Sequence, residues 1–185
     1  MRSERVPDLG KTSVRTSSSC RRTIRPQPAL LELGATMASF ENVVTIRRPG
    51  EDVFAFLADF ENVPQWNYAI VETTKVSPGP VGVGTTYRQT RSAPSRSEEA
   101  FEVTVFEPAS RLEVQGRLRP FTARVSYLLE PTGSGTRLTN TVDLGSSGLL
   151  TLVAPLATSR IKHAVAANLD TMKQLLEGGG RPGVG

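Results

Sequence analysis

The sequence predicts an α+β fold in which seven antiparallel strands are followed by a long C-terminal helix. Three observations predict it: strand patterns separated by turn signals, a helical stretch after the first strand, and apolar residues at helical spacing near the C-terminus. Short strands in close succession are typical of an antiparallel sheet. The strands are expected at 40–47, 69–77, 85–91, 97–106, 111–118, 121–130 and 136–144.

Two short helices are expected between the first two strands. Pro49 and Gly50 end the first strand, and the acidic residues that follow suit the positive end of a helix dipole. The first helix then presents one apolar face, made of Val53, Phe54, Phe56 and Leu57. Asp59 or Asn62 can cap the next turn, where Pro64 suits a first helical position and Trp66 closes the segment.

The C-terminal helical region contains two apolar stripes with different phases. Leu149, Val153 and Leu156 form the first stripe, and Ile161, Ala164, Val165, Met172 and Leu175 form the second. Pro155 lies between the stripes, and a proline inside a helix removes a hydrogen bond. The pattern therefore predicts two helical segments or one kinked helix, ended by Gly178 to Gly180.

The charge of the chain is concentrated in its first residues. The 185 residues carry a net charge of +4, and residues 1–36, with seven basic and three acidic residues, hold the whole excess. The rest, with 15 basic and 15 acidic residues, is balanced. A neutral domain has no general attraction for phosphate backbones, so no nucleic-acid partner is expected.

The same boundary separates two zones of composition. Residues 1–36 are rich in Arg, Ser, Thr and Pro and lack periodicity, so we expect a disordered basic extension. It is either a targeting segment or an extension before a true start at Met37. The folded domain is expected at 37–178, with a flexible tail at 179–185. No apolar run is long enough for a membrane helix, which predicts no stable membrane insertion.

The segment 49–74 resembles the opening of the START-like, Bet v 1-like superfamily, most closely its polyketide cyclase/dehydrase-type branch. The matching residues are Pro49, Val53, Phe54, Leu57, Asp59 and Trp66. Weaker sequence motifs extend the resemblance over about 140 residues. They are Gly82-x-Gly84-Thr85, Phe101-Glu102-Val103, Glu107-Pro108, 135–139 and 168–177. The resemblance implies a helix-grip fold, a curved sheet wrapped round the C-terminal helix with an apolar cavity between them. Members bind lipids, hormones or polyketides, and only some are enzymes.

Strand alternation predicts which residues share the concave face of the sheet. Tyr87 and Gln89 are expected to line the third strand. The expected residues of the later strands are Phe101, Val103, Val105, Leu112, Val114, Gly116, Leu118, Phe121, Ala123, Val125, Tyr127, Leu129, Leu138, Asn140, Val142 and Leu144.

Two amides fall on these apolar faces. Asn140 lies among strand residues and Asn168 within the second helical stripe, and a buried amide is costly unless it is hydrogen-bonded. Each either orients a ligand or bonds a nearby backbone group or water. Trp66 either plugs the core or contacts the ligand. The candidate cavity residues are Trp66, Tyr68, Tyr87, Gln89, Phe101, Phe121, Tyr127, Asn140, Asn168 and Met172.

No catalytic residue can be assigned from the sequence. His163, the single histidine, falls opposite the apolar stripe, and Cys20, the single cysteine, lies in the N-terminal zone. These counts predict no metal site, and nothing requires an organic cofactor. Glu98 and Glu99 are expected to form a solvated strand start. The arginines at strand ends should lie mostly at the surface, although one could guard a cavity mouth and meet an acidic ligand group: Arg91, Arg96, Arg117, Arg119 and Arg124.

Three functions remain open at this point. The leading hypothesis is a protein that binds a small hydrophobic or aromatic molecule, lipid-like or polyketide-like, in the cavity. The second is a polyketide cyclase or dehydratase that acts without metal or organic cofactor. The third is a protein-interaction module with a vestigial cavity. We expect a cytoplasmic protein that is a monomer or a weak homodimer.

Overall fold

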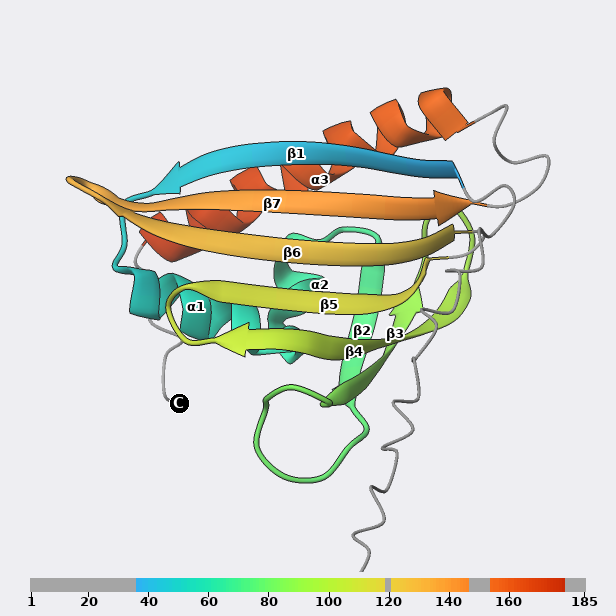
Figure 1. Cartoon of the computed structure of the whole chain (residues 1–185), viewed down its shortest axis with the longest axis horizontal. Helices are drawn as coiled ribbons and strands as arrows, with labels where there is room; N and C mark the ends of the chain where they lie inside the picture. Colours follow the sequence, from blue (N-terminus) through green and yellow to red (C-terminus); the bar gives the residue numbers. More distant parts are fainter. Residues whose placement is uncertain (1–35, 119–120, 147–153, 179–185) are drawn as a thin grey trace, which may run out of the picture. The chain divides into compact units, whose positions relative to one another are not determined.

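The computed structural model describes residues 36–118, 121–146 and 154–178 (Figure 1). The expectations for 1–35 and for the tail at 179–185 lie outside the described residues. In chain order the elements are β1 (Thr36–Ile46), α1 (Gly50–Ala58), η1 (Phe60–Asn62), α2 (Val63–Trp66), β2 (Ile70–Lys75), β3 (Thr86–Arg91), β4 (Ser97–Glu107), β5 (Arg111–Leu118), β6 (Phe121–Thr132), β7 (Gly135–Ser146) and α3 (Ala154–Glu177).

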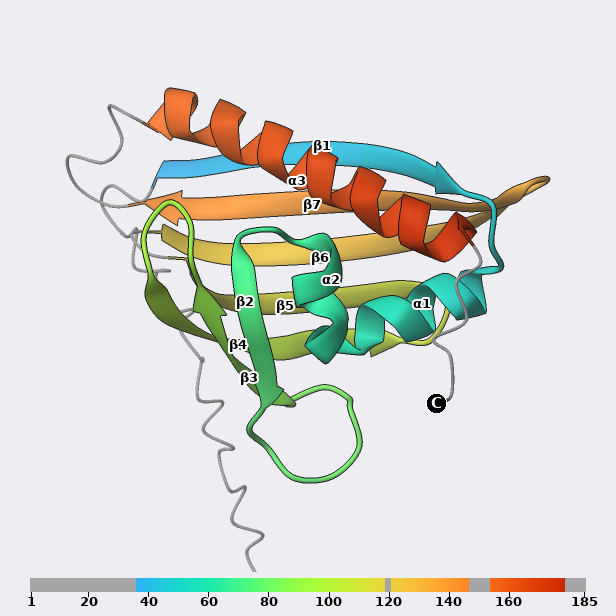
Figure 2. The same ribbon diagram turned by 180° about the vertical axis from the view of Figure 1, so that it is seen from behind.

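The seven strands form one antiparallel sheet in the order β1-β7-β6-β5-β4-β3-β2. Every strand predicted from the sequence is present. The first strand pairs with the last, so that Thr36 lies opposite Ser146 and Ile46 opposite Thr136. Figure 2 shows the helices on one face of the sheet, with α3 running diagonally across it.

The predicted helical pair forms between β1 and β2. Pro49 is the N-cap of α1, and the face that α1 buries consists of Val53, Phe54 and Leu57. Asp59 caps η1, because its side chain accepts a hydrogen bond from the backbone N–H of Glu61 at 3.3 Å. Residues of this segment pack into the main core, where they meet fully buried side chains of the strands such as Leu112 and Leu138.

A bulge in β4 changes the predicted pattern of inward-facing residues. Val103 lies opposite Val114, but Val105 lies opposite Glu113, so that one residue of β4 is left over. A bulge of this kind reverses the faces of the residues that follow it. Phe106, not Val105, therefore reaches the core, where its ring meets that of Phe54 edge-on at 5.2 Å. The expectation for Val105 was wrong for this reason.

The C-terminal helix is one continuous element in the described residues (Figure 2). Pro155 is its second residue. An N–H at this position would have no hydrogen-bond partner within the helix, so the proline removes no helical hydrogen bond and causes no kink. Leu149 and Val153 lie outside the described residues. The buried stripe continues through Met172 and Leu176, whereas Leu175, predicted to lie on it, is 43% exposed.

The end of α3 is fixed to the end of β1. The backbone N–H of Arg47 donates to Oε1 of Glu177 at 2.8 Å, and the Arg47 guanidinium reaches Oε2 at 3.1 Å. The backbone hydrogen bond, followed by the side-chain contact, holds the pKa of Glu177 below its usual value. This contact anchors the C-terminal end of α3 beside the end of strand β1.

A substitution at Gly135 can test the tight contact between the β6–β7 turn and the end of β1. Its φ is +146°, and a Cβ there would lie 2.2 Å from the carbonyl oxygen of Ile46. We expect Gly135→Ala to lower the free energy of unfolding by about 2 to 3 kcal/mol, measured by urea denaturation. Gly133→Ala, where a Cβ meets nothing within 4 Å, is the control and should change it by less than about 1 kcal/mol. Equal losses in the two variants would contradict the contact.

Candidate ligand cavity

A cavity of about 620 Å³ lies between the sheet and α3. The α1–α2 segment contributes to one part of its wall, strands β3 to β7 to another, and α3 to a third. Most of the lining is apolar. The apolar lining residues are Leu57, Phe60, Val63, Trp66, Ala69, Ala93, Pro94, Ala100, Phe101, Val114, Ala123, Val125, Val142, Ile161, Ala164, Val165 and Leu169.

Polar atoms without partners occur within this apolar lining. Asn140 is fully buried, and its Nδ2 donates to the carbonyl oxygen of Ser126 at 3.3 Å. Its Oδ1 has no hydrogen-bond partner among the described residues, and the same is true of Nε1 of Trp66. An unpaired buried polar atom costs free energy that a suitable ligand group can recover. Both residues border the cavity, but the two unpaired atoms themselves are covered by neighbouring protein atoms.

Two further polar side chains line the same cavity. Tyr127 lies opposite Asn140 in the β6–β7 ladder, and Asn168 projects from α3. Burial raises the pKa of the Tyr127 phenol above its usual value, because the charged form would lose its hydration. The phenol is therefore protonated at neutral pH and can donate a hydrogen bond.

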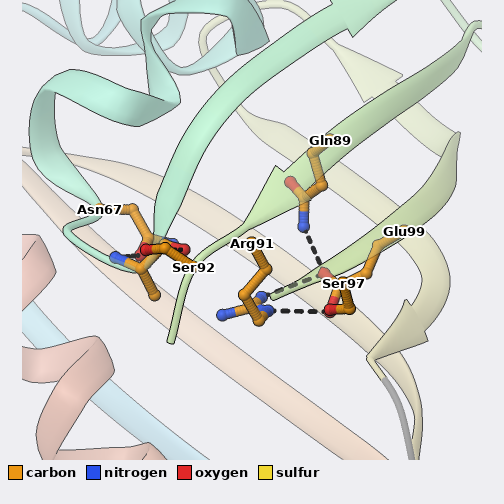
Figure 3. A network of polar contacts seen from close by, with 7 residues as sticks. Asn67, Gln89, Arg91, Ser92, Ser97 and Glu99 are labelled. Atoms are coloured by element: carbon orange, nitrogen blue, oxygen red, sulfur yellow. Dashed lines mark hydrogen bonds and ion pairs between the residues drawn. The ribbon is translucent and has the colours of Figure 1, made fainter. Parts of the chain in front are cut away.

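A charged network occupies the cavity wall on β3 and β4 (Figure 3). Nε and Nη2 of Arg91 contact Oε1 and Oε2 of Glu99 at 2.8 and 3.2 Å. Nε2 of Gln89 donates to Oε2 at 2.7 Å, and Oγ of Ser97 donates to Oε1 at 3.4 Å. Both carboxylate oxygens are therefore occupied by donors of the protein itself.

Glu99 is the residue of the site that the sequence interpretation missed. It was expected in a solvated strand start with Glu98, but its side chain is only 3% exposed. Glu98 is exposed, as predicted. Alternation through Phe101 and Val103 puts Glu99 on the concave face, and this pattern was the available signal. A partner for its charge was not visible, because Arg91 comes from the neighbouring strand.

Seven of the ten predicted cavity residues line the cavity: Trp66, Tyr68, Gln89, Phe101, Tyr127, Asn140 and Asn168. Trp66 is also part of the main core, as one of its two interpretations predicts. Tyr68 lies at the rim, since it is 67% exposed. Asn168 is buried, and among the described residues its side chain has no hydrogen bond to a backbone group.

Two further predicted residues, Tyr87 and Met172, do not line the cavity. Tyr87 is buried in an aromatic cluster, 4.8 Å from the ring of Phe60 and stacked at 5.1 Å on that of Phe101. Met172 is fully buried in the main core, nearer the C-terminal end of α3 than the lining residues of that helix. Both face inward as expected, but packing fills the space around them. The side chain of Phe121 lies outside the described residues.

Other kinds of site find no support within the described ranges. No group of three or more metal-ligating side chains comes together there. None of the helices described is long and apolar enough to cross a membrane. His163 is exposed on α3, as its helical phase predicts.

Comparison with known proteins identifies related sequences and folds. Residues 37–177 match a family model described as polyketide cyclase / dehydrase and lipid transport. No curated protein matches the sequence.

Solved structures share the fold at low sequence identity. The di-domain ARO/CYC StfQ from the steffimycin biosynthetic pathway is 12% identical, with a TM-score of 0.65; the match covers 77% of this chain and 51% of that one. This chain thus spans about half the length of that protein. The Zhui aromatase/cyclase from Streptomyces sp. R1128 is 14% identical, with a TM-score of 0.58 and coverage of 79% and 100%. Ara h 8.0201 is 18% identical, with a TM-score of 0.56 and coverage of 74% and 99%. These similarities confirm the predicted helix-grip fold.

The buried ion pair gives a prediction about stability. Glu99→Ala should lower the free energy of unfolding by about 3 kcal/mol, because it leaves the Arg91 guanidinium, 16% exposed, without its partner. Glu98→Ala, at the exposed neighbouring position, should change it by less than about 1 kcal/mol. Urea denaturation of both variants measures the difference. Similar losses would show that the pair does not hold this wall.

Proposed function

Because this chain belongs to the polyketide cyclase/dehydrase and lipid transport family, we propose that it binds one small hydrophobic or aromatic molecule between the sheet and α3. The observation that carries the proposal is the apolar cavity of about 620 Å³. Ligand sites of roughly 300 to 1,000 Å³ with apolar walls and a few polar groups are usual for small molecules. A ligand that buries about 300 Å² of apolar surface gains roughly 7 kcal/mol before the costs of association.

Polar side chains of the lining would orient this ligand. Tyr127 and Asn168 line the cavity, so the phenol could donate to a ligand oxygen and the amide could bond a ligand hydroxyl. A lipid-like or polyketide-like molecule with a hydroxyl or carbonyl group on an apolar frame fits this arrangement.

Filling the cavity tests the proposal. Ala164 lines it from α3, and Ala164→Trp places a large ring in the space that the ligand would occupy. We expect this variant to weaken binding of the neutral fluorescent probe N-phenylnaphthylamine by about tenfold or more, measured by fluorescence titration.

The matched control changes an exposed position of the same helix. Ala167 is exposed and does not line the cavity, so Ala167→Trp adds the same ring outside it and should leave probe affinity within about twofold. Circular dichroism checks that both variants fold. Absence of probe binding to the wild-type protein, or equal affinity in the two variants, would refute binding in this cavity.

Catalysis is the second candidate function, and the position of the Tyr127 phenol in the cavity wall is the observation that favours it. A buried phenol beside Asn140 could donate a hydrogen bond to a carbonyl oxygen during a ring closure. The occupied carboxylate of Glu99 is less suited to act as a base, since both its oxygens already accept hydrogen bonds.

Tyr127→Phe separates catalysis from simple binding. If the protein accelerates cyclisation of a synthetic poly-β-ketone, the variant should lower that rate by about a hundredfold, because the donor is lost. Its affinity for N-phenylnaphthylamine should stay within about threefold, because only one oxygen is removed. Product formation followed by liquid chromatography measures the rate. A wild-type protein without acceleration would reject this second candidate.

A role as an interaction module is less well supported. That hypothesis expects a small, closed cavity, whereas the observed volume suits a ligand of drug-like size.

A further inference from the structure

The charged residues that line the cavity are predominantly basic. They are Arg91, Arg117 and Arg160 against Glu99 alone. Glu99 is neutralised by Arg91, so the positive excess comes from Arg117 and Arg160, both of which are exposed to solvent. Arg160, on the face of α3 that lines the cavity, is the one placed to meet a ligand. Within the described ranges, neither Arg117 nor Arg160 takes part in an ion pair or a side-chain hydrogen bond.

Arg91 is held in a fixed orientation with donors to spare. Its contacts with Glu99 occupy Nε and Nη2. Figure 3 shows a further nitrogen of its guanidinium on the side away from Glu99, with no interaction drawn to it. A side chain only 16% exposed and paired through two nitrogens loses little freedom when it binds another group. Glu99 therefore acts as a positioning residue for Arg91.

The basic residues gather at one end of the cavity. Arg91 is the last residue of β3, Arg160 lies within the first two turns of α3, and the β3–β4 loop residues Ala93 and Pro94 join them in the lining. Figure 2 shows the end of β3 and the start of α3 at the same end of the sheet, away from α1. The α1–α2 segment supplies apolar lining instead. The cavity thus has an apolar part and a cationic end.

We propose that the ligand is an amphipathic acid, whose carboxylate binds Arg91 and Arg160 while its apolar or aromatic body fills the rest of the cavity. This inference rests on the proposed function and specifies its ligand class. Arginine suits it because the guanidinium donates in a planar fork that matches a carboxylate. A neutral ligand of the same shape would gain neither of these contacts.

A matched pair of fluorescent ligands tests the proposal. Pyrenebutyrate and pyrenebutanol share the aromatic body and differ in the charge of the terminal group. We expect the wild-type protein to bind the acid about tenfold more tightly than the alcohol at low salt. Added salt should weaken binding of the acid but not that of the alcohol, because part of the attraction is screened.

Two variants locate the preference. Arg160→Gln removes one cation, and the double variant R91Q/E99Q removes the ion pair while leaving two amides that can bond each other. Each should lower affinity for the acid by about fivefold and leave affinity for the alcohol within about twofold. Arg137→Gln, an exposed arginine of β7 that does not line the cavity, is the control and should change neither affinity.

The outcomes separate this inference from the proposed function. Equal affinity of the wild-type protein for acid and alcohol, or a preference unchanged in both variants, would overturn the amphipathic-acid proposal while cavity binding stands. Failure of both pyrene ligands and of N-phenylnaphthylamine to bind would overturn cavity binding itself. A preference abolished by Arg137→Gln would place the acid on the outer surface and also reject the proposal.

Discussion

The structure depends on one constraint: a seven-stranded sheet exposes a broad apolar face that must be kept from water. The helices meet this requirement unevenly. Near α1, side chains such as Phe54, Leu112 and Met172 fill the space completely. Towards the start of α3 the sheet and helix enclose a volume of about 620 Å³ instead. The core and the cavity are therefore two parts of one interface, packed to different densities.

This division explains why polar groups collect where they do. A buried charge or amide is tolerated only with partners or access to a polar group. Asn140, Asn168, Tyr127 and the Arg91–Glu99 pair all border the cavity. The dense end of the core is built from apolar side chains. The cavity thus runs from an apolar part to a cationic end.

The fold followed from the sequence because the signals are local and repeated. Alternation and turn residues located the seven strands to within a few positions, and capping residues located the short helices. The errors concern features that depend on contacts between different strands and helices. The bulge that turns Phe106 inward depends on pairing with β5. Glu99 is buried only because Arg91 lies on the adjacent strand. Tyr87 and Met172 face inward, as the strand and helix patterns predict. These patterns do not show whether the space inside is filled by packed side chains or belongs to the cavity.

The pairing of β1 with β7 has a consequence for how the domain folds. Residues at opposite ends of the domain, such as Thr36 and Ser146, become neighbours in the sheet. Such distant pairing requires closure of a long chain segment, which slows folding relative to local contacts. On the ribosome β1 emerges first but gains its strand partner only after β7 has been made. Until α3 follows β7, the hairpins of β2 to β6 also carry an apolar face that this helix does not yet cover, so the period before closure is when this chain most needs protection from aggregation.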